Sequence, residues 1–158
     1  MKGIGILLVV LTGIGMGVIG WLRLHRRVEV LTRFLRVVER LAENIRYSAA
    51  PIEEILIQLL PDLFERDCST ADPRERLGKA IWEQGTGWGL STDDRHLLRG
   101  FADGIGRSDI DGEMRFCGEY HKAIDGHLAQ AREELRVKGR LFVIFGVCGG
   151  LLAALLMW

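Results

Sequence analysis

"GIGILLVVLTGIGMGVIGWLRLHRR", residues 3–27, opens the chain with a long apolar run that ends in a cluster of arginines. No charged residue occurs in residues 3–22, and none occurs in residues 141–158 at the other end of the chain. A helix made from either run is roughly 27–29 Å long, which is close to the roughly 30 Å hydrocarbon core of a bilayer. The two runs therefore predict an N-terminal transmembrane helix at residues 1–22 and a C-terminal one at residues 141–158.

A cleaved signal peptide is the main alternative for the first run. The run is longer than the apolar core of a usual signal peptide, and no small-x-small cleavage site precedes a mature start. Arg23, Arg26 and Arg27 follow it instead, as in a stop-transfer flank. The sequence therefore favours a membrane anchor that stays in the protein.

Basic residues also predict the orientation of both helices. Only Lys2 and the terminal amine precede the first run, whereas three arginines follow it. The second run is preceded by four basic residues and followed by none. Because cytoplasmic flanks are enriched in lysine and arginine, we expect a two-pass membrane protein with a cytoplasmic centre and both termini on the non-cytoplasmic side. The basic residues before the second run are Arg132, Arg136, Lys138 and Arg140.

Glycines inside the first run raise a second question. Residues 15–20 read Gly-x-Gly-x-x-Gly, the fingerprint of a dinucleotide-binding turn. That fingerprint needs a strand before it, a helix after it and an acidic residue about 20 residues later. These glycines lie instead inside an unbroken apolar run that ends in an arginine cluster. Gly13 and Gly17, like Gly146 and Gly150, instead have the small-x-x-x-small spacing of closely packed membrane helices. We expect them to pack against each other or against partners, although glycine is also simply common in membrane helices.

Residues 23–140 hold every charged side chain except Lys2, so this centre has a formal charge of −1. A nucleic-acid-binding domain normally carries an excess of basic residues, because phosphate contacts dominate its affinity. The balance therefore predicts no nucleic-acid partner. The three cysteines, Cys68, Cys117 and Cys148, form no Cys-x-x-Cys pair, which argues against a disulfide framework and a zinc site.

The centre is predicted to be a helical bundle, which makes the fold class all-α. One amphipathic helix continues from the first run and ends before Pro51, and a second starts at Pro51. "DPRE", residues 72–75, predicts a third helix with Asp72 as its N-cap and Pro73 at its first position. The apolar residues of the first helix recur at helical spacing: Leu31, Phe34, Leu35, Val38, Leu41, Ala42 and Ile45.

Two further helices are predicted after a glycine-rich connector at residues 85–90, in which Trp88 is expected to be a packing anchor. Ser91 or Thr92 caps the fourth helix, and Gly106 ends it. Ser108 is predicted to cap the longest helix, which has no proline before the second apolar run. Its semi-apolar positions alternate four and three residues apart, as in a heptad seam: Ile110, Met114, Cys117, His121, Ile124, Leu128, Ala131 and Leu135.

The sequence contains no convincing catalytic, cofactor or metal site. The four histidines have neither His-x-x-x-His nor Glu-x-x-His spacing. "SDIDGE", residues 108–113, lacks the 12-residue register and the closing glutamate of a calcium loop. We therefore expect a protein that is not an enzyme and that binds no cofactor.

Two segments resemble conserved segments of the stage III sporulation protein AB family. "ENIRYSAAPIEEIL", residues 43–56, resembles a family segment with glutamate, tyrosine, proline and a second glutamate, and "GIGRSDIDGE", residues 104–113, resembles the family's Leu-Gly-x-Ser-Asp-x-x-x-Gln signature. The chain departs from that signature at Ile105 and Glu113. The layout of two membrane helices around a helical centre is also similar. The matching residues are Glu43, Tyr47, Pro51, Glu54, Gly106, Ser108 and Asp109.

The resemblance implies a role without enzymatic activity. Members of the family belong to a secretion-like channel complex in the mother-cell membrane around the forespore, and the complex is needed for endospore formation. The cytosolic domain is expected to be similar to the helical F domain of type II secretion systems. The implied partners are the lipid bilayer, a cytosolic secretion-type ATPase and ring-forming membrane proteins, and the chain itself could form a homo-oligomer.

Two alternatives are open at this point. A membrane-tethered regulator or sensor would use residues 108–113 or the glycine-rich connector to bind a ligand. An integral membrane enzyme would need a convergent set of polar residues, and the sequence offers none. The matching residues also have a purely structural explanation, because proline starts helices, glycine ends them and Ser-Asp caps them.

Overall fold

The computed structural model describes the backbone of residues 2–47, 52–59 and 72–156. Side chains are described for residues 15, 18–47, 54–59, 72–139, 141, 144 and 148. Pro51 and the connection at residues 61–71 lie outside these residues, so the expected roles of both stay predictions.

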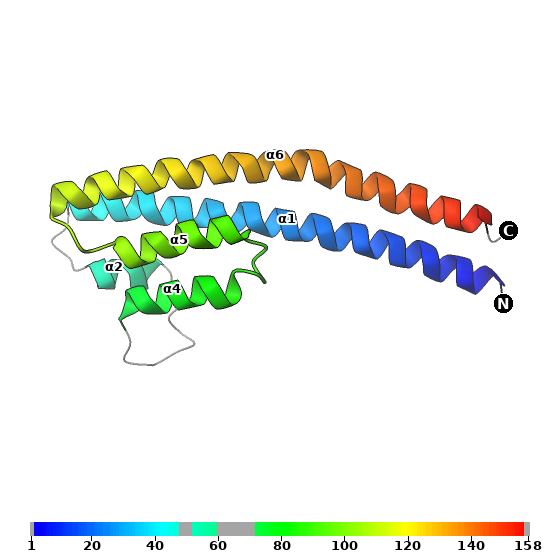
Figure 1. The fold of residues 1–158 in the computed structure, drawn as a ribbon, viewed down its shortest axis with the longest axis horizontal. Helices are drawn as coiled ribbons and strands as arrows, with labels where there is room; N and C mark the ends of the chain where they lie inside the picture. Colours follow the sequence, from blue (N-terminus) through cyan, green and yellow to red (C-terminus); the bar gives the residue numbers. More distant parts are fainter. Residues whose placement is uncertain (1, 48–51, 60–71, 157–158) are drawn as a thin grey trace. The chain divides into compact units, whose positions relative to one another are not determined.

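Five helices make up the regular structure of the described backbone, and this part of the chain contains no strand (Figure 1). The prediction of an all-α fold is therefore confirmed. No helix within the described part of the chain is both long enough and apolar enough to cross a membrane. The transmembrane helices expected at residues 1–22 and 141–158 stay predictions from the sequence. The helices are α1 (Lys2–Tyr47), α2 (Ile52–Leu59), α4 (Pro73–Gln84), α5 (Thr92–Gly104) and α6 (Ile110–Leu156).

The chain divides into two compact units. A terminal unit contains residues 1–28 and 129–158, and a central unit contains residues 29–128. Both α1 and α6 are continuous helices that contribute one part to each unit.

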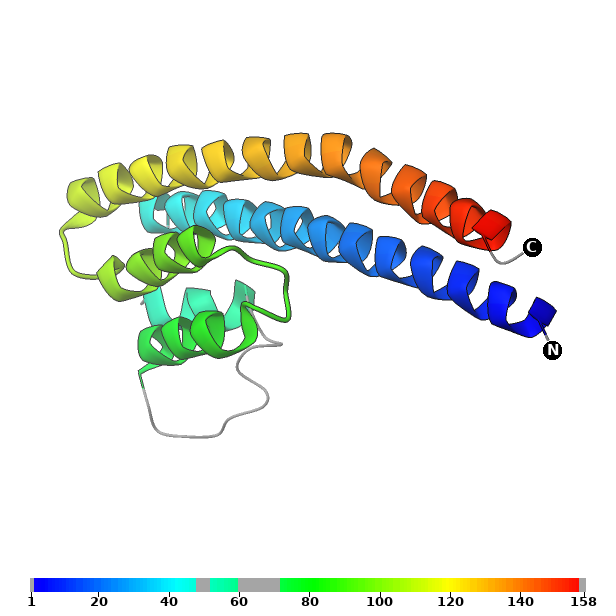
Figure 2. The ribbon, with the colours of Figure 1, turned by 45° about the vertical axis from the view of Figure 1, so that its right-hand side comes forward.

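The core of the central unit is built from the apolar faces of all five helices. In this unit α1 and α6 lie side by side, α5 lies along α1, and α4 packs on the far side of α5 (Figures 1 and 2). Of the periodic apolar positions of α1, Leu31, Phe34, Val38 and Leu41 are buried as predicted, whereas Leu35, Ala42 and Ile45 are half-buried. Val37 is buried in addition. Fully buried side chains from the other helices include Leu56, Leu77, Ile81, Leu98, Phe101, Ile124 and Leu128.

Local capping fixes where α4 and α5 begin. Asp72 is the N-cap of α4, and its Oδ1 accepts the N–H of Arg74 at 2.9 Å. Ser91, rather than Thr92, is the N-cap of α5, and it forms a reciprocal capping box with Asp94. The predicted cap at Asp72 is confirmed, and the choice left open at the start of α5 is settled.

The glycine-rich stretch 85–90 is a hydrogen-bonded turn, where the sequence had suggested only a flexible connector. Leu90 N–H donates to the Gly85 carbonyl, and Gly89 N–H donates to the Thr86 carbonyl. Gly89 has a φ of 77°, which glycine adopts far more readily than other residues. Leu90 is buried, so the turn ends in the core.

The start of α6 differs from the prediction in two ways. The helix begins at Ile110, and its N-cap is Asp109, because Asp109 Oδ1 accepts the N–H of Gly112 at 3.1 Å. The prediction that Ser108 caps this helix is wrong, since Asp109 is the residue directly before Ile110 and its side chain accepts the N–H of the third helical residue. Ile110, the first residue of the expected heptad seam, is 66% exposed, whereas Cys117, Ile124 and Ala131 are buried as the seam predicts.

Candidate partner-binding site

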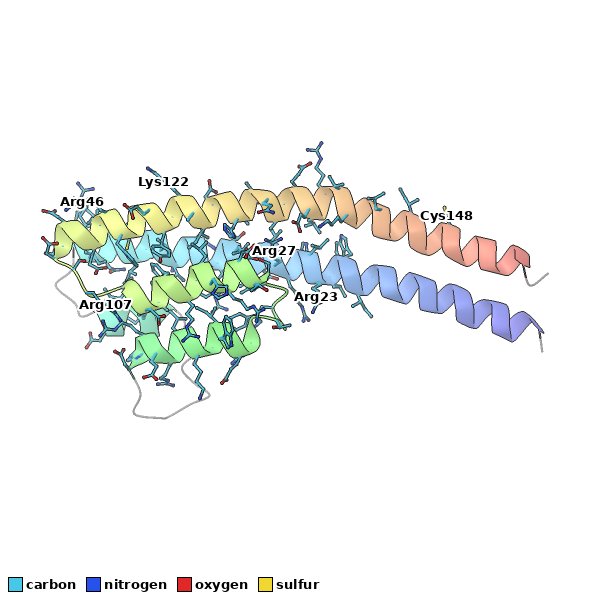
Figure 3. The ribbon with its side chains drawn as sticks, viewed as in Figure 1. Arg23, Arg27, Arg46, Arg107, Lys122 and Cys148 are labelled. Carbon is cyan, nitrogen blue, oxygen red and sulfur yellow. The ribbon has the colours of Figure 1, made fainter. Side chains whose placement is uncertain are left out.

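The two family segments meet at one end of the central unit. Glu43 and Tyr47 lie in the last turns of α1, and residues 106–109 form the connection from α5 to α6. We call residues 43–47 together with residues 106–113 the motif end; in Figure 3, the labelled residues Arg46 and Arg107 mark it. Glu54 is exposed on α2, and no contact joins it to these residues within the described part.

Glu113 organises the motif end. Its Oε1 atom accepts three consecutive backbone N–H groups, from Gly106 at 2.9 Å, Arg107 at 2.9 Å and Ser108 at 3.0 Å. The side chain is buried, and its second oxygen, Oε2, has no hydrogen-bond partner. Because three donors converge on one anionic acceptor, the connection has a fixed backbone path.

Arg74 and Gly106 support the same connection from the side of α4 and α5. The Arg74 Nη1 donates to the carbonyl of Ile105 at 3.2 Å, next to the left-handed Gly106 with its φ of 79°. The expectation that Gly106 ends the fourth helix fits this geometry, since α5 ends at Gly104 with Ile105 as its C-cap. The Arg74 guanidinium thus supplies a donor for two carbonyl groups where the chain turns from α5 to α6.

An open groove of about 470 Å³ lies between α1 and α6 next to the motif end. Its sides are joined by a 2.9 Å contact between Glu39 Oε1 and His121 Nε2. Gly118 forms a gap in the wall on the α6 side, because a methyl group added there would have no atom within 4 Å. The other residues along the groove are Val38, Ala42, Glu43, Met114 and Cys117.

The groove holds no set of groups suited to catalysis. Burial, together with the nearby Glu113 carboxylate, raises the pKa of the Cys117 thiol to about 11, so the thiol is protonated at neutral pH and a poor nucleophile. Within the described residues, His121 pairs with one carboxylate, that of Glu39. Across the described residues, no group of three or more potential ligands could hold a metal ion.

Two apolar side chains are exposed at the motif end. Tyr47 is 81% exposed, and Ile110 is 66% exposed. Tyr47 lies in the last turn of α1 and Ile110 in the first turn of α6, and the antiparallel contact of Glu39 with His121 brings these two turns to the same level. Exposed aromatic and aliphatic side chains on an otherwise hydrogen-bonded surface are typical of protein-binding sites.

Two structural residues were missed by the sequence interpretation. Glu113 was noted only as a departure from the family signature, and its three backbone contacts could not be read from spacing. Asp94 is fully buried, and its Oδ1 lies 2.7 Å from His127 Nδ1, which links α5 to α6. The only sequence signal for Asp94 was its position three residues after Ser91, as in a capping box.

For the glycines of the expected membrane helices, the structure describes the backbone but not the surrounding side chains. Gly13 and Gly17 lie in α1, and Gly146 and Gly150 lie in α6. Their surroundings fall outside the described side chains, so their packing role stays a prediction. In the terminal unit, α1 and α6 do meet at another glycine, because a Cβ atom at Gly139 would lie 3.1 Å from the Trp21 ring.

Comparison with known proteins gives one match. The model of the family described as stage III sporulation protein AB matches residues 2–158. No curated protein and no solved structure matches the chain. Because the match spans nearly all of the sequence and includes both segments of the motif end, this chain belongs to the stage III sporulation protein AB family.

Proposed function

We propose that this chain is a platform component, without enzymatic activity, of a secretion-like membrane complex that acts at stage III of sporulation. Its family consists of stage III sporulation proteins. The observation that carries the proposal is the convergence of both family segments on one exposed end of the central unit. In the proposal, this motif end binds another component of the complex.

The geometry of the motif end suits protein recognition. Exposed Tyr47 and Ile110 would lose apolar surface to a partner, and tyrosine is frequent among the residues that dominate binding energy. Glu113 holds residues 106–108 in place before binding, so little ordering entropy would be lost when a partner docks. A rigid loop beside two exposed anchors supports a docking role over a catalytic one.

Membrane anchoring is part of the same proposal. α1 and α6 run without interruption from the central unit into the two apolar runs. The proposed arrangement is a two-pass protein of the mother-cell membrane around the forespore, with residues 23–140 in the cytoplasm. A cytosolic secretion-type ATPase could then reach the motif end, and ring-forming proteins could meet the membrane helices.

Photo-crosslinking in sporulating cells tests the binding role. A photoreactive amino acid at Tyr47 or at Ile110 should crosslink to one defined protein, while the same group at Glu83, an exposed position on α4, should not. Crosslinks of equal yield at all three positions, or none at the first two, would contradict the proposal.

A genetic test uses a matched pair of variants. Ile110→Ser should reduce spore formation at least about tenfold, because losing the partner's apolar contact costs on the order of 1.4 kcal/mol or more. Ile57→Ser, which changes an exposed isoleucine on α2, should sporulate normally. Vegetative growth should be normal in both strains, and a growth defect in the absence of a spore defect would point to another function.

A further inference from the structure

The charges of the chain are divided unequally between its two units. The terminal unit contains eight lysine and arginine residues and two glutamates, which gives a formal charge of +6. Because the whole chain has no net charge, the central unit has a formal charge of −6. The charged residues of the terminal unit are Lys2, Arg23, Arg26, Arg27, Arg132, Arg136, Lys138, Arg140, Glu133 and Glu134.

Part of this positive charge is used inside the terminal unit. Arg27 is buried, and its Nη1 lies 3.0 Å from Oε2 of Glu134. Lys138 Nζ lies 3.5 Å from the same oxygen. The Arg27 contact joins α1 to α6, and the Lys138 contact lies within α6. Together they neutralise Glu134.

Three arginines are left without such a partner. Arg23, Arg26 and Arg132 are exposed, and no acidic group of the described residues pairs with them. In Figure 3, Arg23 extends away from α6. We call these three residues the arginine collar, since they come from both helices of the terminal unit.

Exposed apolar side chains lie close to Arg23 and Arg26 in the sequence, and others follow Arg132 nine or more positions later. On α1, Ile19 and Leu22 are exposed, and on α6 Leu141 and Ile144 are exposed. Trp21 lies between Ile19 and Arg23 in the sequence, and its ring lies against Gly139. A membrane helix commonly places apolar residues in the hydrocarbon, tryptophan at the interface and arginine among the head groups. The residues of α1 follow the same order.

We infer that the arginine collar binds the phosphate groups of anionic glycerophospholipids. This inference rests on the membrane anchoring of the proposed function. The planar guanidinium group suits bidentate binding of phosphate, and clustered basic residues beside a membrane helix attract anionic lipids. An acidic protein segment would also satisfy the charge, but the exposed apolar residues beside the collar fit lipid chains better.

Spin-labelled lipids measure this preference with the full-length chain. The protein is reconstituted in vesicles of phosphatidylcholine with 30% phosphatidylglycerol, and the association of labelled phosphatidylglycerol is compared with that of labelled phosphatidylcholine. The wild-type chain should favour phosphatidylglycerol about fivefold or more, because each basic residue near an anionic surface contributes about that factor. Sodium chloride at 0.5 M should weaken the preference.

Two triple variants that remove the same charge test whether the lipid preference comes from the arginine collar. Arg23→Gln with Arg26→Gln and Arg132→Gln should bring the preference close to one. The control, Arg107→Gln with Arg115→Gln and Lys122→Gln, removes the same charge from exposed positions of the central unit and should keep the preference. Circular dichroism of both variants should match the wild type, which separates lost lipid binding from lost folding.

The outcomes separate the inference from the proposed function. If the chain resists carbonate extraction but prefers neither lipid, or if both triple variants lose the preference equally, the collar inference is overturned and the anchoring stands. If carbonate extracts the chain from vesicles, the anchoring fails, and the collar inference fails with it. Binding of soluble polyglutamate by the wild type but not by the collar variant, without a lipid preference, would assign the collar to a protein partner instead.

Discussion

Glu113 shows how one side chain can determine a whole connection. Three backbone N–H groups of residues 106–108 would be left without an acceptor if its carboxylate were removed, and a buried donor without a partner is costly. The family signature has glutamine at this position, and a glutamine oxygen can accept the same bonds. Glutamate and glutamine at this position therefore differ at the second side-chain atom, which is Oε2 in this chain. That atom is buried and without a hydrogen-bond partner.

Substitution of Glu113 tests this role. Glu113→Ala should lower the free energy of unfolding of the full chain by about 1–3 kcal/mol, since the three N–H groups lose their acceptor. Glu113→Gln should cost less than Glu113→Ala, because the amide oxygen keeps these bonds. Thermal unfolding in detergent, followed by circular dichroism, measures both. Equal losses for the two variants would show that Glu113 acts through its charge.

Cys117 gives a pH-dependent prediction. Burial, with a smaller effect of Glu113, raises the pKa of its thiol from the ordinary 9.0 to about 11. The folded chain therefore holds this proton more tightly than the unfolded chain does. The resulting stability is complete below pH 9 and is lost as the pH rises from about 9 to 11.

Alkylation followed by peptide mass spectrometry checks the same group. Native Cys117 should react with iodoacetamide much more slowly than in the urea-unfolded chain at pH 8, because the thiolate is the reactive form and the buried thiol is protonated. Similar rates in the folded and unfolded chain would contradict the buried, protonated state.

At the residue scale, the sequence predicted the local contacts better than the long-range ones. Asp72 was identified as a cap, and Ser91 as one of two candidates beside Thr92, because a cap depends on residues within three positions. Ser108 was assigned in place of Asp109 because both types cap helices, and only the Gly112 contact distinguishes them. The link from Asp94 to His127 spans 33 positions and leaves no pattern in the sequence.

Among the elements, α5 and α6 contain glycines with different surroundings. A Cβ atom at Gly118 or Gly126 would meet nothing within 4 Å. At Gly104 of the neighbouring helix α5, a Cβ atom would lie 2.6 Å from the Phe116 ring. Glycine is thus required by packing at Gly104, whereas α6 accepts the helix-weakening effect of glycine at two open positions.

Alanine substitutions separate these cases. Gly118→Ala should stabilise the full chain by up to about 1 kcal/mol, because alanine favours the helix interior. Gly104→Ala should destabilise it by about 1–3 kcal/mol, because the Phe116 ring would have to move. Thermal unfolding measures both. If Gly118→Ala also weakens the crosslink at the motif end, a partner approaches α6 closely at the groove; Gly126→Ala is the control outside the groove.

The periodic apolar patterns explain why the helices could be predicted and where the prediction of burial was wrong. Apolar spacing in α1 and from Cys117 to Ala131 in α6 reports burial directly, since both faces pack in the core. Ile110 matched the heptad seam, but it lies in the first turn of α6 and is 66% exposed. A repeat in the sequence cannot indicate where its packing partner ends.

On the scale of the whole molecule, charge and hydropathy divide the chain in the same way. The terminal unit joins two apolar runs to basic flanks, and the central unit is acidic. An acidic unit is repelled by anionic head groups, whereas basic flanks are attracted to them. This division favours one membrane orientation, in which the basic flanks stay on the cytoplasmic side.

Cysteine labelling tests that orientation in cells. In a background with Cys68→Ala, Cys117→Ala and Cys148→Ala, the chain is produced in vegetative cells, so that its non-cytoplasmic side faces the medium. A membrane-impermeant maleimide should then label Lys2→Cys in intact cells. It should label Glu83→Cys, an exposed position of α4, only after lysis. Labelling of both positions only after lysis would contradict the two-pass arrangement, and labelling of Glu83→Cys alone in intact cells would reverse it. The basic flanks supply the physical reason for the expected result, so replacing Arg23, Arg26 and Arg27 by glutamine should increase the fraction of inverted chains.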